Sequence, residues 1–308
     1  MAIYPVSAGK LGQLLGQEFE GLQPLLAEEK EVLWRILHWQ VEPWGGPTDG
    51  LTWIAEGKVL GYLPLRISGD IVVVGRMFVS RSAPVEAVEA TLLDAAIRDA
   101  FSISMINGIS GELFGAASAT LARLRSRWPA QIRLRSLMEA AWTPSGGPRE
   151  PFALEPWHGD HLAAAAGLLW RSYTGTSEFM PDPAFNTQEG VTILMNQVLT
   201  HPVCGRFEPE ASFIARDPGS DDLLGFALAS RMGEVQGHLL EVAVEPRARR
   251  RGLGKALVTR VLDALWGLGC RTTHLAVNHD NPGAIALYES LGFRERHQFP
   301  DLRLKRQA

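Results

Sequence analysis

The sequence predicts a mixed α/β protein built from two successive domains of the same kind. A chain of 308 residues with 46% hydrophobic content is long enough for two hydrophobic cores. The stretch WTPSGGPREP, at 142–151, carries three prolines and two glycines and divides the chain nearly in half. Strand-like and helix-like segments mix in the second half, as in a sheet flanked by helices. We therefore expect domains at 1–141 and 152–308, with a linker at 142–151.

The second half gives the clearer succession of elements. A short strand, FALEPW, precedes helices expected over 161–170 and 191–199. ASFIARD and LLGFALASR are strand-like runs separated by the turn residues PGSDD, which predicts a β-hairpin. A strand near 239–244, an amphipathic helix, a strand near 273–277, a helix over 282–291 and a closing strand from Phe293 follow. Asn281 before Pro282 is typical of a helix start, and Gly292 of a helix end.

The first half repeats this pattern in a degenerate form. Placing Val79 on Val244, an offset of 165 residues (244 − 79), puts apolar residues of the first half on apolar residues of the second at helical spacing. The first half has PVEAVE where the second has RRRGLG, and Arg123 lies opposite Tyr288. We expect a duplicated fold whose first copy lacks the anion site described below.

Composition and charge exclude several classes of protein. A formal net charge of −4 argues against a general nucleic-acid binder. No apolar segment approaches the roughly 18 residues of a membrane span, and the N-terminus lacks the features of a signal peptide. Cys204 and Cys270 are too far apart to suggest a disulfide framework or a metal site. We expect a cytoplasmic monomer or homodimer without metal, nucleic-acid or membrane partners.

The segment EVAVEPRARRRGLGKALV, residues 241–258, has the features of a phosphate-binding turn. Gly252 and Gly254 permit backbone conformations and close approaches that a Cβ atom would prevent. The helix that follows offers unpaired N–H groups and the positive end of its dipole. Formal positive charge comes from Arg249, Arg250, Arg251 and Lys255. The alternative is a solvated charge run before a flexible helix start, because neither a Walker A nor a dinucleotide motif is present.

Two motifs together resemble the GNAT acyltransferase superfamily. VAVEPRARRRGLGKAL matches the family's R/Q-x-x-G-x-G/A loop through Arg249, Gly252 and Gly254. The stretch NPGAIALYESLGF is similar to the family's N-x-x-A…LY…GF segment. The resemblance covers 152–308, and for 1–141 it rests on the internal repeat. It implies two tandem GNAT-like domains, each a mostly antiparallel twisted sheet flanked by helices, with the second one catalytic.

The resemblance also implies acetyl-CoA as the acyl donor and a set of residues that bind it. The strand that ends at Val244 would pair with the pantetheine arm, and an N–H near Val242 would polarise the thioester carbonyl. Tyr288 would protonate the departing thiolate, since a phenol with a pKa of about 10 suits a thiol near 8.5. The coenzyme-binding residues are thus Val242, Ala243, Val244, Arg249, Arg250, Arg251, Gly252, Leu253, Gly254, Lys255, Asn281 and Tyr288.

Two residues compete for the role of general base, because the attacking amine must lose a proton. Family members often carry Glu or His at the position of His238, and a reference pKa of about 6.5 suits a base at neutral pH. Simple alternation places His238 on one face of the strand with Val242, and Glu241 on the other. A β-bulge would change that phase. We favour His238 and keep Glu241 as the alternative, with His274 expected to be structural.

The sequence predicts an N-acetyltransferase that acts on a primary amine of a small molecule by direct attack. The acceptor pocket is expected to include 171–190, with the segment RSYTGTSEFMPD. Two alternatives remain open: a protein or peptide N-acetyltransferase, with WRILHWQVEPW as a docking surface, and a non-catalytic acyl-CoA sensor. Fold resemblance alone does not identify the acceptor.

Overall fold

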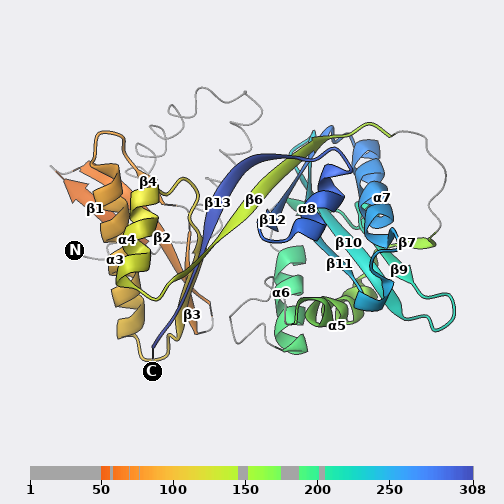
Figure 1. Ribbon diagram of the computed structural model, residues 1–308, viewed down its shortest axis with the longest axis horizontal. Helices are drawn as coiled ribbons and strands as arrows, with labels where there is room; N and C mark the ends of the chain where they lie inside the picture. The colour runs from red at the N-terminus through yellow and green to blue at the C-terminus, as the bar shows by residue number, and fades with distance from the viewer. Residues whose placement is uncertain are drawn as a thin grey trace. The chain divides into compact units, whose positions relative to one another are not determined.

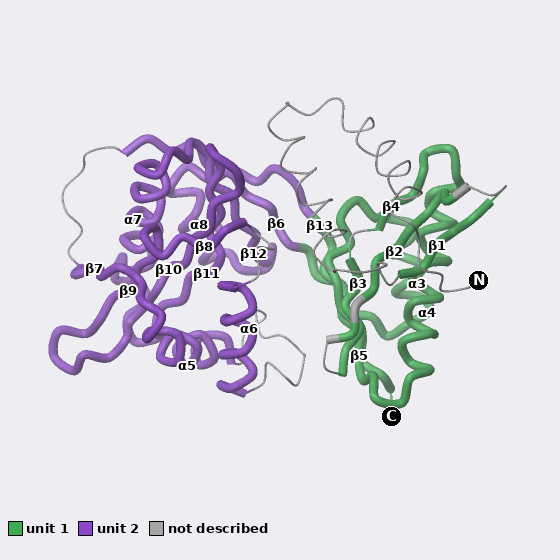
Figure 2. Tube along the Cα trace, turned by 180° about the vertical axis from the view of Figure 1, so that it is seen from behind, with its two compact units in different colours: residues 1–134, 299–308 green, residues 135–298 purple. Residues whose placement is uncertain are grey.

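The chain folds into two compact units that are described here separately (Figures 1 and 2). The computed structural model describes residues 50–55, 58–68, 70–75, 77–144, 152–174, 187–200 and 205–307. Unit 1 comprises 1–134 and 299–308, and unit 2 comprises 135–298. These boundaries differ from the expected ones, because residues 135–141 lie in unit 2 and the C-terminal ten residues lie in unit 1. The segment WRILHWQVEPW, most of the expected linker and residues 175–186 of the expected acceptor pocket lie outside the described residues.

The described part of unit 1 is a mostly antiparallel sheet packed against the helices α3 and α4. Along the chain it contains β1 (Gly50–Ala55), β2 (Lys58–Ser68), β3 (Ile71–Val74), β4 (Phe78–Val79), α3 (Val85–Ser102), β5 (Gly108–Glu112) and α4 (Ser118–Arg127). The strand order is β1-β2-β3-β5, with β4 paired to β2. All these pairs are antiparallel except β3 with β5.

Unit 2 repeats the plan seen in the described part of unit 1. It contains β7 (Leu154–Pro156), α5 (Leu162–Tyr173), α6 (Gln188–Thr200), β8 (Arg206–Phe207), β9 (Phe213–Arg216), β10 (Leu223–Met232), β11 (Gln236–Val244), α7 (Leu253–Gly267), β12 (Thr272–Asn278) and α8 (Pro282–Glu289). The strand order is β12-β11-β10-β9-β7, with β8 on β10, and β11 with β12 is the parallel pair. The predicted hairpin, both predicted helix ends at Asn281 and Gly292, and the helices and strands near their expected positions are confirmed.

The offset of 165 residues carries elements of unit 1 onto elements of unit 2. It places Lys58, the first residue of β2, on Leu223, the first residue of β10. It places Ser102, the last residue of α3, on Gly267, the last residue of α7. The same order and the same single parallel pair follow in both units. The fold is therefore a tandem duplication of a mixed α/β sheet, as predicted.

The two repeats exchange their last strands. By the offset of 165, β6 (Gln131–Ala141) ends the first repeat and β13 (Arg294–Lys305) ends the second. Residues 135–141 of β6 pair antiparallel with β12, in unit 2. Residues 301–305 of β13 pair antiparallel with β5, in unit 1. Each sheet is thus completed by a strand from the other repeat, which explains why the units do not follow the predicted domain boundaries.

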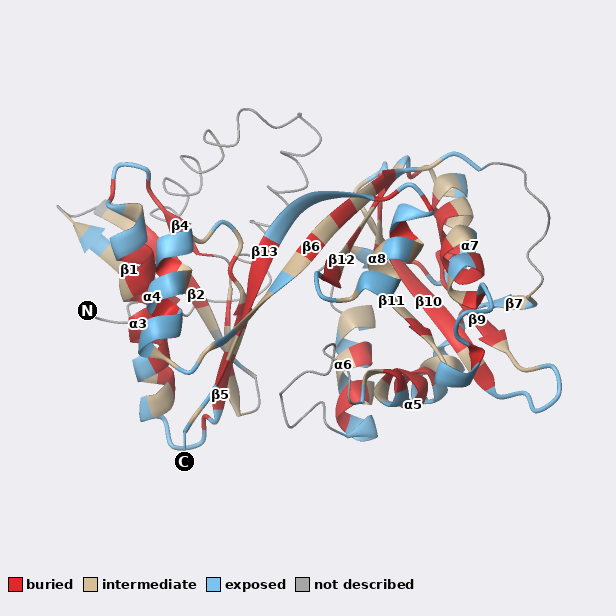
Figure 3. Ribbon diagram, viewed as in Figure 1, coloured by how far each residue is buried: buried red, intermediate tan, exposed pale blue. Residues whose placement is uncertain are grey.

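The exchanged strands carry buried residues into the cores that they complete (Figure 3). Leu302 and Leu304 belong to the core of unit 1, beside residues of α3. Met138 and Ala140 belong to the core between the unit 2 sheet and α7. A second core in unit 2 lies on the opposite face, where α5 and α6 cover the sheet. No helix in the part of the chain that the structure describes combines the length and apolar character that a membrane crossing requires.

The exchange predicts which unit each buried strand residue stabilises. Leu302 and Met138 are both buried, so truncating either side chain to alanine should lower the free energy of unfolding by about 2–5 kcal/mol. Leu302→Ala should increase amide hydrogen exchange in β2, β3 and β5, and Met138→Ala should increase it in β11, β12 and α7. Hydrogen exchange measured by mass spectrometry checks this. The reverse assignment of the two variants would mean that each repeat keeps its own last strand.

Candidate active site

The turn before α7 presents backbone N–H groups without any side-chain cap. Arg250 and Gly252 both have left-handed backbone conformations, with φ of 63° and 88°. Gly252 is the N-cap residue of α7, and no side chain accepts a hydrogen bond there. Left-handed residues at the start of a helix turn successive N–H groups toward one point, which forms a concave anion site.

Gly254 keeps the space in front of this turn open. A Cβ atom at Gly254 would lie 3.5 Å from Leu287 of α8 and 3.7 Å from Val244 of β11. These are ordinary van der Waals contacts, so packing within the protein does not require a glycine at this position. The absence of a side chain instead leaves room beside the first N–H groups of α7, as a bound diphosphate would require.

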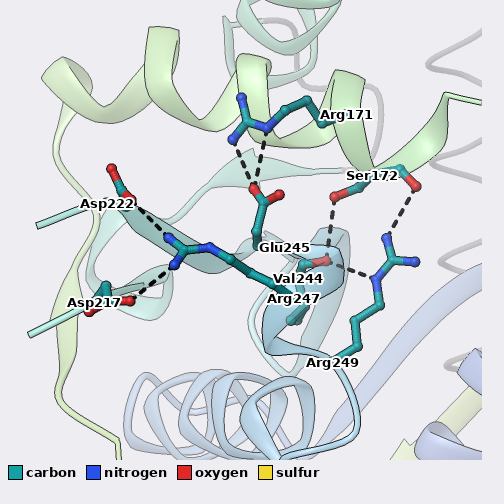
Figure 4. Close-up of polar contacts among 8 residues, drawn as sticks. All are labelled: Arg171, Ser172, Asp217, Asp222, Val244, Glu245, Arg247 and Arg249. Atoms are coloured by element: carbon teal, nitrogen blue, oxygen red, sulfur yellow. Dashed lines mark hydrogen bonds and ion pairs between the residues drawn. The ribbon is translucent and has the colours of Figure 1, made fainter. Parts of the chain in front are cut away.

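The cationic run divides into two groups with different roles. Arg247 pairs with Asp217 and Asp222, at 3.3 and 2.8 Å (Figure 4). Arg249 donates from Nε to the carbonyl oxygen of Val244, at 3.0 Å, and from Nη2 to that of Ser172, at 3.2 Å. Arg249 thus holds the turn against β11 and α5, and Arg247 holds it against the connection between β9 and β10. The sequence could not distinguish them from their neighbours, because all of them are arginines in one exposed run.

The other basic side chains of the run are available to bind an anion. Arg250, Arg251 and Lys255 are exposed, and none forms an ion pair or side-chain hydrogen bond with another described residue. Their charges lie around the uncapped start of α7. The turn can therefore hold a doubly charged anion with both backbone dipoles and formal charges.

Strands β11 and β12 separate next to this turn. Their parallel pairing covers three positions and ends where His238 pairs with His274. Beyond it, β11 continues to Val244 and stays paired with β10 on its other edge. The edge of residues 239–244 that faces β12 therefore carries no described strand partner. This open edge includes Val242, Ala243 and Val244, the residues expected to bind the pantetheine arm.

A β-bulge at Leu240 corrects the expected orientation of the two base candidates. Leu228 pairs with Glu241 and Ala229 with Leu239, so Leu240 is the extra residue. Leu239 and Val242 pack in the core beneath α7, whereas Leu240 and Ala243 pack toward α5 and α6. Strict alternation was wrong because it ignored this residue. His238 and Glu241 consequently lie on the same face of β11, the face covered by α5.

The surroundings of His238 weaken it as a base. Burial, and to a smaller extent the proximity of His274 and Arg135, lower the pKa of His238 from 6.5 to about 3. An imidazole with so low a pKa is neutral at pH 7 but holds an added proton poorly. The sequence could not reveal this, because the desolvation comes from residues distant along the chain.

Glu241 is held by two donors. The hydroxyl group of Tyr173, the last residue of α5, donates a short hydrogen bond to Oε1 of Glu241. The N–H of Val242 donates to the same oxygen, at 3.2 Å. The N–H expected to polarise a thioester carbonyl is thus paired with the neighbouring carboxylate.

Tyr288 lies on α8, and Asn281 is the N-cap residue of the same helix. Tyr288 is buried in the core that also includes Leu253 and Val242, with its ring 5.7 Å from that of Phe293, centroid to centroid. Asn281 accepts a hydrogen bond from the N–H of Ala284 at 3.1 Å, so its side-chain oxygen caps the helix. The structure brings Tyr288 to the same core as Val242, and it gives Asn281 a structural partner.

Sequence reasoning missed one polar cluster of this sheet. Nε2 of His274 lies 2.6 Å from Oε2 of Glu139, and Arg296 donates to Oε1 of the same carboxylate. These contacts, above all the hydrogen bond with His274, lower the pKa of Glu139 from 4.5 to about 2. Glu139 belongs to the exchanged strand β6, so only knowledge of the exchange could have placed it here. Among the described residues, no group of His, Cys, Asp or Glu is arranged to hold a metal ion.

Residues 177–293 match the model of the acetyltransferase (GNAT) family. A mycothiol acetyltransferase of Actinosynnema mirum is 29% identical over 293 residues, which cover 90% of this chain and 92% of the relative. The chain is thus similar to acetyltransferases of the GNAT family over most of its second half. A ribosomal protein bS18 alanine N-acetyltransferase of Escherichia coli is 49% identical over 57 residues, 18% of this chain and 38% of the relative. The predicted family and the predicted enzyme class are confirmed.

Solved structures of GNAT proteins share the whole fold. A GCN5-related N-acetyltransferase from Sphaerobacter thermophilus superposes with a TM-score of 0.72 at 16% identity, covering 99% of this chain and 94% of that one. A tandem GNAT protein from the clavulanic acid biosynthesis pathway gives a TM-score of 0.57 at 16% identity, covering 83% and 82%. At these identities the likeness concerns the fold, and it agrees with the tandem arrangement found here.

The lowered pKa of His238 predicts a specific pH dependence of stability. The unfolded chain protonates this histidine below about pH 6.5, whereas the folded chain does so only near pH 3. The unfolded state then binds more protons, so the free energy of unfolding should fall as pH decreases between these values. Urea denaturation of the wild type and of His238→Gln, repeated at each pH, measures this. The stability difference between the two should shift steadily in favour of the variant below pH 6.5. Parallel curves would contradict the burial of the imidazole.

Proposed function

We propose that the protein transfers an acetyl group from acetyl-CoA to a primary amine of a small molecule. The observation that carries the proposal is the uncapped, left-handed turn at Arg250 and Gly252, which lies beside the open edge of β11. A diphosphate at the turn would leave a linear thioester arm free to lie along that edge. The match of residues 177–293 to the GNAT family model and the long match to a mycothiol acetyltransferase support this choice of donor and acceptor.

The coenzyme would supply the activated thioester, and the residues of this chain would do the rest. Arg250, Arg251, Lys255 and the first N–H groups of α7 would bind the diphosphate. The N–H of Val242 would hydrogen-bond the thioester carbonyl oxygen as negative charge develops there. It can do so only if Glu241 releases it, because the two are paired in the free protein.

We place the proton acceptor at Glu241 in preference to His238. The pKa of His238, at about 3, makes it a poor acceptor for a proton that leaves an amine. Glu241 lies on the same face, next to the N–H that would bind the thioester carbonyl. When the thioester carbonyl takes that N–H, Oε1 of Glu241 would lose this donor and could accept the proton of the amine. Tyr288 would return a proton to the departing thiolate.

A peptide acceptor is the second candidate, and a non-catalytic acyl-CoA sensor is the third. The similarity of a shorter segment to a ribosomal protein alanine N-acetyltransferase favours the peptide. The near full-length match to an enzyme named for mycothiol favours the small molecule. Turnover on peptides alone would select the second candidate, and coenzyme binding without turnover would select the sensor.

The coenzyme site is tested with two glycines at matched helix positions. Gly254 is the second residue of α7 and Gly283 the second residue of α8, and a Cβ atom at Gly283 would meet only Oδ1 of Asn281, at 3.9 Å. Gly254→Ala should weaken coenzyme A binding at least about tenfold, because the methyl group occupies space beside the diphosphate. Calorimetry with coenzyme A, and release of coenzyme thiol from acetyl-CoA with a panel of small amines and peptides, provide the measurements. Gly283→Ala should bind and turn over as the wild type does. Equal effects of the two substitutions, or no heat of binding to the wild type, would refute the site.

The proposed acid and base predict separate kinetic losses. Tyr288→Phe keeps the buried ring and Glu241→Gln keeps the side-chain size, so both variants should fold and bind coenzyme A as the wild type does. Each should lower kcat by about 10²-fold or more, the usual contribution of a general acid or base. A pH–rate profile should lose its acidic limb in Glu241→Gln and keep it in His238→Gln. The opposite pattern would return the role of base to His238.

A further inference from the structure

His274 is tied to a carboxylate through one ring nitrogen and lacks a partner at the other. Nε2 lies 2.6 Å from Oε2 of Glu139. Nδ1 is buried and has no hydrogen-bond partner among the described residues. A buried polar atom without a partner is costly, so such atoms in folded proteins are usually satisfied by water or a ligand.

The carboxylate determines which ring nitrogen of His274 is the acceptor. The pKa of Glu139 is about 2, so its side chain is ionised near pH 7 and can only accept hydrogen bonds. Nε2 must therefore carry the hydrogen that bridges the two groups. In the neutral ring this leaves a lone pair on Nδ1, which is ready to accept a hydrogen bond from another molecule.

The position of His274 connects this lone pair with the open edge of β11. His274 pairs with His238 at the last position before β11 and β12 separate, so both side chains lie on the face that also carries Glu241. Val242 is four residues further along β11. A strand rises about 3.3 Å per residue, and the bulge shortens it slightly, so roughly 10–13 Å along β11 separate His238 from Val242.

The surrounding charges restrict what can bind. Glu139 is neutralised by Arg296. Arg135, on β6, is close enough to contribute to the lowered pKa of the neighbouring His238. Besides the two imidazole rings, the Glu139 carboxylate and the guanidinium groups of Arg296 and Arg135 lie in this region. A second ammonium group would be repelled there, so a neutral donor such as a hydroxyl or amide N–H fits better.

We propose that His274, oriented by Glu139, recognises a hydroxyl or amide N–H of the acceptor at about 10 Å from the amine that is acetylated. This inference rests on the proposed function and names the class of acceptor: a primary amine of about sugar or dipeptide length, with a neutral hydrogen-bond donor at its far end. Glu139 is a positioning residue, because it acts through His274. The first repeat thus contributes to specificity in unit 2 through its exchanged strand.

Two pairs of amines test the inference by kinetics. Aminohexanol and heptylamine differ in a terminal hydroxyl or methyl group at about the required distance, and aminopropanol and butylamine make the same comparison at a shorter distance. The wild type should prefer aminohexanol over heptylamine about tenfold in kcat/KM, as for one hydrogen bond, and should show no such preference in the short pair. His274→Ala and Glu139→Ala should abolish the preference, whereas Glu139→Gln should retain part of it. His297→Ala, at an exposed histidine of β13, is the matched control and should keep the full preference.

A spectroscopic measurement separates this inference from the proposed function. Nitrogen-15 NMR of the full-length protein should show a hydrogen on Nε2 of His274 and none on Nδ1, and aminohexanol with coenzyme A should shift the Nδ1 resonance. Turnover of amines with an unchanged preference in His274→Ala would overturn the inference and leave the proposed function intact. If no amine is turned over, the proposed function fails. An Nδ1 resonance that carries a hydrogen, or that aminohexanol leaves unshifted, would then overturn the inference as well.

Discussion

The separation of β11 from β12 after three paired positions is the constraint on which the site depends. Backbone N–H and C=O groups that lose a strand partner must find another one. Here the edge of residues 239–244 has no strand partner, and side chains bond its Val242 N–H and Val244 carbonyl instead. This edge leads directly into a turn whose own N–H groups are uncapped. A single ligand with a linear arm and a diphosphate could satisfy both sets of groups. The strand edge and the uncapped turn would each be a local irregularity on their own. Together they form a continuous row of backbone polar groups along β11 and the start of α7.

The bulge at Leu240 determines which side chains accompany that track. It rotates the strand so that Glu241 faces α5 and Val242 faces α7, where Tyr288 is buried. In the proposed mechanism, the acid Tyr288 and the base Glu241 would therefore lie on opposite sides of one strand. One inserted residue thus sets the orientation of groups from two different helices.

The sequence predicted the elements whose signals are local. The apolar stripe of α7, the cap at Asn281, the turn at Gly292 and the hairpin of β9 and β10 all depend on neighbouring residues, and all are present. The features that it missed depend on distant ones. β6 and β13 occupy equivalent positions in the two repeats, so their patterns suit either sheet and cannot reveal the exchange. The same holds for Arg249, whose partners lie on β11 and α5, and for His238, whose burial comes from the assembled fold.

The exchanged strands also impose an order on folding during synthesis. Residues 135–141 leave the ribosome before the rest of unit 2, so that sheet can close as soon as its own strands are made. Unit 1 is translated first but waits for residues 301–305, almost the last of the chain, to cover the edge of β5. A nascent strand left open for so long invites pairing with other chains. The sequence of β5, GISGE, is short, contains two glycines and ends in a carboxylate, and such a strand is a poor template for aggregation.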